Sequence, residues 1–183
     1  MILYTERLIL RPWDISEAQT LFDIAKDPKV GPDCGWPPHQ NIDESLYVIE
    51  NVFNSPECYA VCLKEDNIPI GTIEIKLKGR SELTDREDEC ELGFWLASKF
   101  WGQGIMPEAT REIIRHAFED LGLKKIWISH HDKNDKSRRA QEKAGFKYDH
   151  TIYDSDMPLL GCKRNKIVNV MTREDYDAVL SSK

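Results

Sequence analysis

Apolar and polar residues alternate along much of this chain with the two-residue period of a half-buried strand. The alternation is clearest at residues 69–77, where Gly71, Ile73, Ile75 and Leu77 are separated by polar side chains. Residues 90–96 form a short and mostly apolar run, which is typical of a buried strand. The same reasoning predicts further strands at residues 3–10, 59–63, 125–130, 146–152 and 166–171.

Other segments repeat apolar residues at steps of three and four, the period of one helix face. The strongest repeat follows residue 104, and its apolar positions are Met106, Ala109, Ile113, Ala117 and Leu121. Pro107 is tolerated only in the first turn of a helix, and Gly122 fits the residue just past the end. Both boundaries of this helix are therefore predicted.

Three more helices and three loops complete the pattern. A capping box formed by Asp14 and Glu17 starts the first helix, and its expected buried face holds Ile15, Ala18, Phe22 and Ala25. The other helices are expected at residues 44–53 and 137–144, and the loops at 28–38, 79–88 and 154–164. This order predicts an α/β protein with a mixed sheet and helices on both faces. The 183 residues fit one domain, expected over residues 1–183.

Composition narrows the class of protein. A net charge of −7 argues against a nucleic-acid surface. No run reaches the ~20 apolar residues of a membrane span, and no secretory signal follows Met1, so we expect a cytoplasmic protein without membrane contact. The five cysteines form no Cys-x-x-Cys pair, and His130 and His131 point to opposite faces of a strand. We expect free thiols and no metal.

Charge is distributed unevenly along the chain. Acidic residues gather at 82–91, and basic residues gather at Lys124, Lys125, Lys133, Lys136, Arg138, Arg139 and Lys143. Each set is interpreted either as a solvated surface or as a functional one. In the functional interpretation the basic set faces phosphates and the acidic set attracts a cationic amine.

The segment Lys99-Phe100-Trp101-Gly102-Gln103-Gly104 joins a predicted strand to the strongest predicted helix. Glycine allows positive φ and close approach of a ligand, and the first turn of a helix offers unpaired amides at the positive end of its dipole. The segment therefore predicts a phosphate site, although a tight turn that binds nothing has the same pattern. The glycine spacing fits neither a P-loop nor a dinucleotide fingerprint.

This segment resembles the phosphate loop of the GNAT superfamily of acetyl-CoA-dependent N-acetyltransferases, with Lys99 where a glutamine or arginine is usual. Two further segments carry the resemblance: residues 5–13, TERLILRPW, and residues 134–146, which begin NDKS and end EKAGF. Together they are similar to the branch of ribosomal-protein-alanine N-acetyltransferases. The resemblance implies a mixed, mostly antiparallel sheet with splayed central strands at residues 91–96 and 125–130.

It also implies which residues contact acetyl-CoA, which is the acetyl donor. The pantetheine arm would pair with main chain near Phe94 and Leu96, and the amides of residues 102–105 would hold the pyrophosphate. The full set of expected cofactor-binding residues is Phe94, Trp95, Leu96, Lys99, Trp101, Gly102, Gln103, Gly104, Ile105, Met106, Asn134 and Ser137. For Trp95 and Trp101, plain core packing is the alternative.

Two catalytic residues are predicted. In the family, the positions of Asn134 and Ser137 hydrogen-bond the pantetheine and protonate the departing thiolate; a turn residue and a helix cap are the alternatives. Many relatives use a tyrosine as the acid where this chain has Gln141, so Ser137 is the remaining candidate. Glu91 is the candidate base acting through water, with a salt-bridged carboxylate as the alternative and Glu89 and Tyr148 as weaker candidates.

The predicted function is transfer of an acetyl group from acetyl-CoA to a primary amine by direct attack. The acceptor would be a protein N-terminal α-amine or a small amine, and the enzyme a monomer or homodimer. The alternative is a non-catalytic acyl-CoA-binding sensor, which the glutamine at position 141 favours and the Asn134–Ser137 pair opposes.

Overall fold

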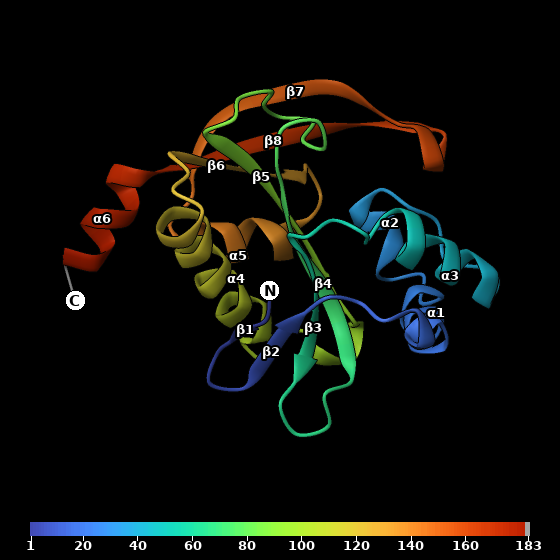
Figure 1. Ribbon diagram of the computed structural model, residues 1–183. Helices are drawn as coiled ribbons and strands as arrows, with labels where there is room; N and C mark the ends of the chain where they lie inside the picture. Colours follow the sequence, from blue (N-terminus) through green and yellow to red (C-terminus); the bar gives the residue numbers. More distant parts are fainter. Residues whose placement is uncertain (182–183) are drawn as a thin grey trace. The chain divides into compact units, whose positions relative to one another are not determined.

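The computed structural model describes residues 1–181 and has the hydrogen-bonded strand order β1-β2-β3-β4-β5-β6-β8-β7 (Figure 1). The chain forms two compact units. The first contains residues 1–74, 94–112 and 157–161; the second contains residues 75–93, 113–156 and the chain from Cys162 onward. The single domain expected from the sequence stays a prediction. No helix in the described part of the chain is long and apolar enough to cross a membrane.

The first unit begins with a hairpin of β1 (Leu3–Tyr4) and β2 (Leu8–Arg11). Strand β2 pairs antiparallel with β3 (Cys58–Leu63), and β3 pairs antiparallel with β4 (Pro69–Lys76), which continues into the second unit. The helical elements are η1 (Ile15–Glu17), α1 (Ala18–Ala25), α2 (Gly31–Cys34) and α3 (Ile42–Asn51). Helices α1 and α3 pack together and bury Leu21, Ala25 and Ile49 beside the sheet.

The second unit is built on β6 (Lys125–His131), which pairs parallel with β5 (Glu89–Leu96) and antiparallel with β8 (Cys162–Thr172). Strand β7 (Lys147–Met157) lies beside β8 (Figure 1). Helix α5 (Asp135–Ala144) connects β6 to β7, and α6 (Arg173–Ser181) follows β8.

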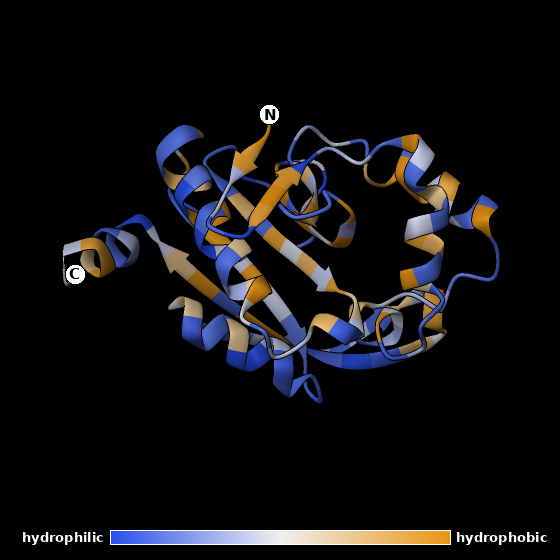
Figure 2. Ribbon diagram, turned by 90° about the horizontal axis from the view of Figure 1, so that it is seen from below, coloured by the Kyte–Doolittle hydropathy of each residue, from blue (hydrophilic) through white to orange (hydrophobic). Residues whose placement is uncertain are grey.

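Two short elements, η2 (Ser98–Phe100) and η4 (Pro158–Leu160), lie in the first unit. Helix α4 (Ile105–Arg115) passes from the first unit into the second and ends in a π-helical turn, η3 (His116–Asp120). Figure 2 shows apolar and polar stretches alternating along the helices. The α/β class with a mixed, mostly antiparallel sheet is confirmed.

Several predicted boundaries are wrong for local reasons. Residues 3–10 form a hairpin rather than one strand, because the Thr5 hydroxyl accepts from the Leu8 amide at 3.0 Å and closes a turn. The expected loop at 28–38 contains the short helix α2, which Gly35 ends at a φ of 96°. The 3-10 turn η1 shifts the face of the first helix, so Leu21 is buried and Ile15 is 54% exposed.

The expected loop at 154–164 is also wrong. Strand β7 extends to Met157 and β8 begins at Cys162, with Pro158 and Gly161 in the connection. The strand ends are largely exposed, so they lack the apolar alternation that marks a half-buried strand. Helix α6 was not predicted; its Tyr176 ring stacks on Phe118 at 5.1 Å.

Candidate active site

The glycine turn between β5 and α4 leaves its main-chain amides without protein partners. Gly102 and Gly104 have φ angles of 77° and 74°, in the left-handed region that favours glycine. Within residues 1–181, no protein group accepts a hydrogen bond from the amides of Gly102, Gln103, Gly104 or Ile105. A Cβ added at Gly102 would meet no atom within 4 Å. Four amide donors without a protein acceptor, at a helix N-terminus, fit the phosphates of a cofactor.

Hydrogen bonds fix this turn to the preceding segment. The Trp101 indole Nε1–H donates to the Leu96 carbonyl at 2.8 Å, and the Gln103 side-chain Nε2 donates to the Lys99 carbonyl at 2.9 Å. The Lys99 ammonium lies over the Phe100 ring, 4.9 Å from its centroid. A contact between the Lys99 side chain and the cofactor therefore stays a prediction.

The side chains around the turn are mostly packed inward. Ile105 and Met106 are 3% and 6% exposed, so they present main chain rather than side chain to a ligand. Trp95 belongs to an aromatic cluster, with ring centroids 6.5 Å from Trp13 and 5.9 Å from Trp36. These contacts favour the packing interpretation of Trp95, and its cofactor contact stays a prediction.

The parallel ladder between β5 and β6 is short. Its pairs run from Glu89–Lys125 to Leu92–Ile128, although β6 continues to His131. In the described chain, the last three residues of β6 thus have no β5 partner in the ladder, while β8 pairs with them as far as His131.

Asn134 and Ser137 lie together at the start of α5. The Asn134 side-chain oxygen accepts from the Ser137 amide at 3.0 Å, which is a helix N-cap. Gln141, only 1% exposed, donates from Nε2 to the Ser137 Oγ and to the Ser129 carbonyl, both at 3.0 Å. Its Oε1 accepts from Asn169 at 2.6 Å. In the described chain, no protein group accepts the hydroxyl hydrogen of Ser137, so that proton is available to a ligand.

Glu91 is 6% exposed, and its carboxylate already has three donors. The Lys76 ammonium contacts Oε1 at 3.1 Å, and Oε2 accepts from the Ser81 hydroxyl at 3.1 Å and from the Glu82 amide at 2.8 Å. A carboxylate has about four lone-pair positions, so about one remains for a water. Glu91 therefore forms the salt bridge given as the alternative, and about one lone-pair position remains through which it could act as a base.

The two weaker candidates for the base have different surroundings. Burial raises the pKa of Glu89, but hydrogen bonds from Trp127 and Thr84 and the charges of Lys125 and Arg86 outweigh it and lower the pKa below its ordinary value. A carboxylate with a lowered pKa is a weaker base. Tyr148 is 64% exposed.

Ion pairs within the second unit neutralise much of the acidic run. Its carboxylates pair as Glu82–Lys166, Glu87–Lys78, Asp88–Arg86, Asp88–Lys124, Glu89–Arg86, Glu89–Lys125 and Glu91–Lys76. In the basic set, Arg138 pairs with Asp135 and Glu142. The solvated-surface interpretation is favoured for the exposed members Glu82, Glu87 and Arg138, whereas Glu89 and Glu91 are buried.

The predicted site residues form two groups, one in each unit. The first unit holds Phe94, Trp95, Leu96, Lys99 and Trp101–Met106; the second holds Glu91, Asn134 and Ser137. The described residues contain no group of His, Cys, Asp or Glu suited to a metal ion.

Free amides at a helix N-terminus, in a turn of two glycines with positive φ, define a protein suited to bind a phosphate-bearing ligand. The family described as "Acetyltransferase (GNAT) domain" matches residues 7–147. The chain therefore belongs to the GNAT family of acetyltransferases, which transfer an acetyl group from acetyl-CoA, and the resemblance predicted from the sequence is confirmed.

Two curated relatives match shorter segments. An FsC-acetyl coenzyme A-N(2)-transacetylase of Aspergillus fumigatus is 35% identical over 92 residues, which are 50% of this chain and 39% of that protein. YdaF of Bacillus subtilis, named provisionally as a ribosomal N-acetyltransferase, is 41% identical over 58 residues, or 32% of each chain. A solved GNAT-family acetyltransferase from Bacillus anthracis has a TM-score of 0.82 at 19% identity, covering 95% of this chain and 99% of that one.

Proposed function

We propose that this protein transfers an acetyl group from acetyl-CoA to the α-amine of a protein N-terminus or of a small molecule. The observation that carries the proposal is the set of four unpartnered amides in the glycine turn of a GNAT-family chain. These amides would hold the pyrophosphate, and the main chain near Phe94 and Leu96 would pair with the pantetheine arm. The proposed setting is the cytoplasm, which the five free cysteines support.

Acetyl-CoA supplies an activated acetyl group as a thioester, whose carbonyl carbon the amine attacks directly. Glu91 would accept a proton from the amine through a water bound at its remaining lone pair. Ser137 would donate its free hydroxyl proton toward the departing sulfur, while Gln141 keeps the Ser137 oxygen in position. Because a thiol has a pKa near ~8.5, it leaves readily as a thiolate, and Ser137 contributes modestly.

The preference for an α-amine follows from proton affinity. An α-amino group with a pKa of ~8 is about one tenth neutral at pH 7, whereas a lysine amine with a pKa of ~10.4 is neutral in only a few molecules per ten thousand. Removing the lysine proton therefore costs about 3 kcal/mol more. A water-relayed carboxylate with three donors is poorly suited to supply that difference. The names of two relatives, one a ribosomal N-acetyltransferase and the other an N(2)-transacetylase, support a nitrogen as the acceptor atom.

The test measures thiol release from acetyl-CoA with a panel of amines and N-terminal peptides. The decisive pair is one peptide with a free amino terminus and its N-terminally blocked twin that carries an internal lysine. We expect faster release with the free peptide. Equal rates with the blocked twin would contradict the α-amine preference.

Two observations favour a second candidate, a non-catalytic acyl-CoA-binding sensor. Gln141 carries no acidic proton, and Glu91 is held by three donors. A sensor would bind acetyl-CoA in calorimetry but release no thiol with any amine of the panel.

A further inference from the structure

Arg7 lies in the N-terminal motif that carries the family resemblance, and no role follows for it from the sequence. In the structure its Nε donates to the Glu108 Oε2 at 2.7 Å, and its main-chain amide donates to Oε1 at 2.8 Å. The Thr5 hydroxyl donates to the same Oε1 at 2.5 Å. Glu108 is 8% exposed and lies in the first turn of α4. The Arg7 side chain is therefore fixed at the start of this helix.

The other side of the guanidinium faces the glycine turn. Its Nη1 donates to the Gln103 carbonyl at 3.1 Å, and its Nη2 lies 3.6 Å from the position that a Cβ would take at Gly104. Within the described residues, no protein group accepts a hydrogen bond from Nη2, and the Arg7 side chain is 46% exposed. The two N–H donors of Nη2 thus remain available beside the unpartnered amides of the turn.

We infer that Arg7 is a phosphate-binding residue: its Nη2 donates to the cofactor pyrophosphate alongside the amides of the glycine turn. This inference rests on the proposed function and deepens it. The planar guanidinium presents donors in a fixed fork, so it contacts Glu108, Gln103 and a phosphate oxygen at once. It also neutralises the Glu108 carboxylate, which would otherwise repel an anion at the helix N-terminus.

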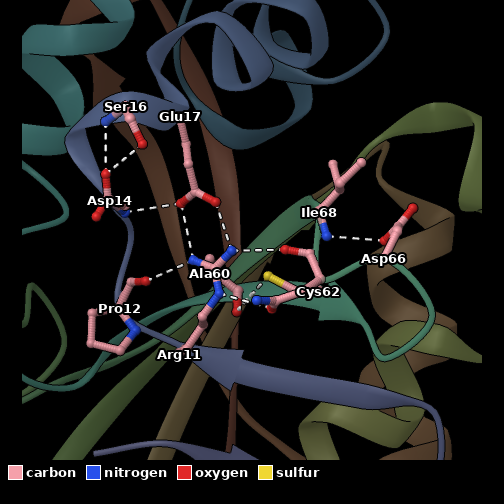
Figure 3. A network of polar contacts seen from close by, with 10 residues as sticks. Arg11, Pro12, Asp14, Ser16, Glu17, Ala60, Cys62, Asp66 and Ile68 are labelled. Carbon is pink, nitrogen blue, oxygen red and sulfur yellow. Dashed lines mark hydrogen bonds and ion pairs between the residues drawn. The ribbon is translucent and has the colours of Figure 1, made fainter.

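Arg11 provides a contrast within the same motif. Its Nη2 and Nη1 donate to Glu17 at 2.6 and 3.0 Å, and its Nε donates to the Asn67 side chain at 2.9 Å. The Pro12 carbonyl accepts a further hydrogen bond from Nη1 (Figure 3). The Asn67 carbonyl accepts one from Nη2. Every guanidinium nitrogen of Arg11 therefore has a protein partner, so this arginine stabilises the fold and is a matched control.

The experiment measures binding of CoA and of dephospho-CoA by calorimetry to the wild-type protein, Arg7→Gln, Arg7→Lys and Arg11→Gln. We expect Arg7→Gln to weaken both ligands by the same factor, about 10- to 100-fold, because one charge-assisted contact to the shared pyrophosphate is lost. Arg7→Lys keeps the charge without the fork and should be intermediate. Arg11→Gln should lower the melting temperature and leave CoA affinity within about twofold of wild type.

Because Arg7→Gln leaves Glu108 without its cation, a double variant, Arg7→Gln with Glu108→Gln, keeps a neutral pair and guards against unfolding. A folded single or double variant with wild-type affinity for CoA would overturn the inference. A larger loss for CoA than for dephospho-CoA would also overturn it, because it would assign Arg7 to the 3′-phosphate. If the wild-type protein itself bound no CoA, the proposed function would fail first.

Discussion

Gln141 is a buried residue of the predicted site and stands where many relatives have a tyrosine. The side chain joins Ser129, Ser137 and Asn169 by hydrogen bonds and is 1% exposed. In the proposed mechanism, Gln141, at the position where many relatives have a tyrosine as the acid, positions the Ser137 hydroxyl. Any proton for the leaving group would then come from the Ser137 hydroxyl that Gln141 orients.

At Glu91, the predicted role depends on the proton of the amine. We expect Glu91→Gln to reduce turnover about tenfold or more at pH 6.5 and far less at pH 9, because an α-amine with a pKa of ~8 is mostly neutral at the higher pH. Steady-state rates with the free-terminus peptide at both pH values measure this. Glu87→Gln is the control, because Glu87 is a surface carboxylate with a side chain 84% exposed. A loss that does not vary with pH would assign Glu91 to positioning.

At the scale of elements, the glycine turn gives the clearest prediction. We expect Gly104→Val to abolish CoA binding while the protein stays folded, because the branched side chain occupies the space beside the amides and strains a φ of 74°. Gly79→Val is a matched control: Gly79 has a φ of 85° and a Cβ there would meet nothing within 4 Å. Both variants should lose similar stability, on the order of 1–3 kcal/mol.

Calorimetry with CoA and thermal unfolding of both variants separate strain from binding. If Gly104→Val folds and binds CoA as the wild type does, the phosphate-loop assignment is wrong. Loss of CoA binding in Gly79→Val as well would point to a general effect of strain.

Elements with local signals were predictable from the sequence. Asp14 and Glu17 form the expected capping box, and Gly145 ends α5 in a left-handed conformation with a φ of 96°. The exposed ends of β7 and β8 have no periodic apolar pattern, so these strand ends could not be predicted from the sequence.

The site was predictable only in part. The glycine turn has a local motif, but the contact between Arg7 and Glu108 joins residues 101 positions apart. The donors around Glu91 likewise come from β4 and from the segment after it. No spacing rule covers such pairs, because the fold alone brings them together.

For the whole molecule, acid should destabilise the folded state through paired carboxylates. Burial raises the pKa of Glu108, but hydrogen bonds from Thr5 and Arg7 and the Arg7 charge outweigh it, so the pKa is lowered from its usual value of 4.5. The hydrogen bond and charge of Arg115 similarly lower the pKa of Asp120. A lowered folded-state pKa contributes stability above the unfolded pKa, which is lost as pH falls through the folded value. We therefore expect the free energy of unfolding to decrease as the pH is lowered from about 4.5.

Urea unfolding at pH 7, 5, 4 and 3 checks this. Glu108→Gln should be about 1–3 kcal/mol less stable than the wild type at pH 7. Below pH 5, its free energy of unfolding should change less with pH than that of the wild type. Glu87→Gln should follow the wild type. An unchanged slope in Glu108→Gln would show that other carboxylates dominate acid unfolding.

The ion pairs of the acidic run lead to a prediction about salt. With its carboxylates paired to Lys and Arg within the second unit, the run exerts little net attraction at a distance. At saturating acetyl-CoA, the KM for a cationic amine should change by less than about twofold between 50 and 200 mM salt. A steep rise in KM with salt would contradict this prediction and would show that the acidic run attracts the acceptor electrostatically.

The ion pair between Arg7 and Glu108 also has a consequence for when the site can form during synthesis of the chain. About a hundred residues must be added after Arg7 before Glu108 is synthesised, so the nascent chain carries the β1–β2 hairpin without this contact over that stretch of translation. Closing so long a loop is slow compared with forming a local helix. The ability to bind CoA would thus arise late in folding. A fusion partner that blocks β1 would delay it further.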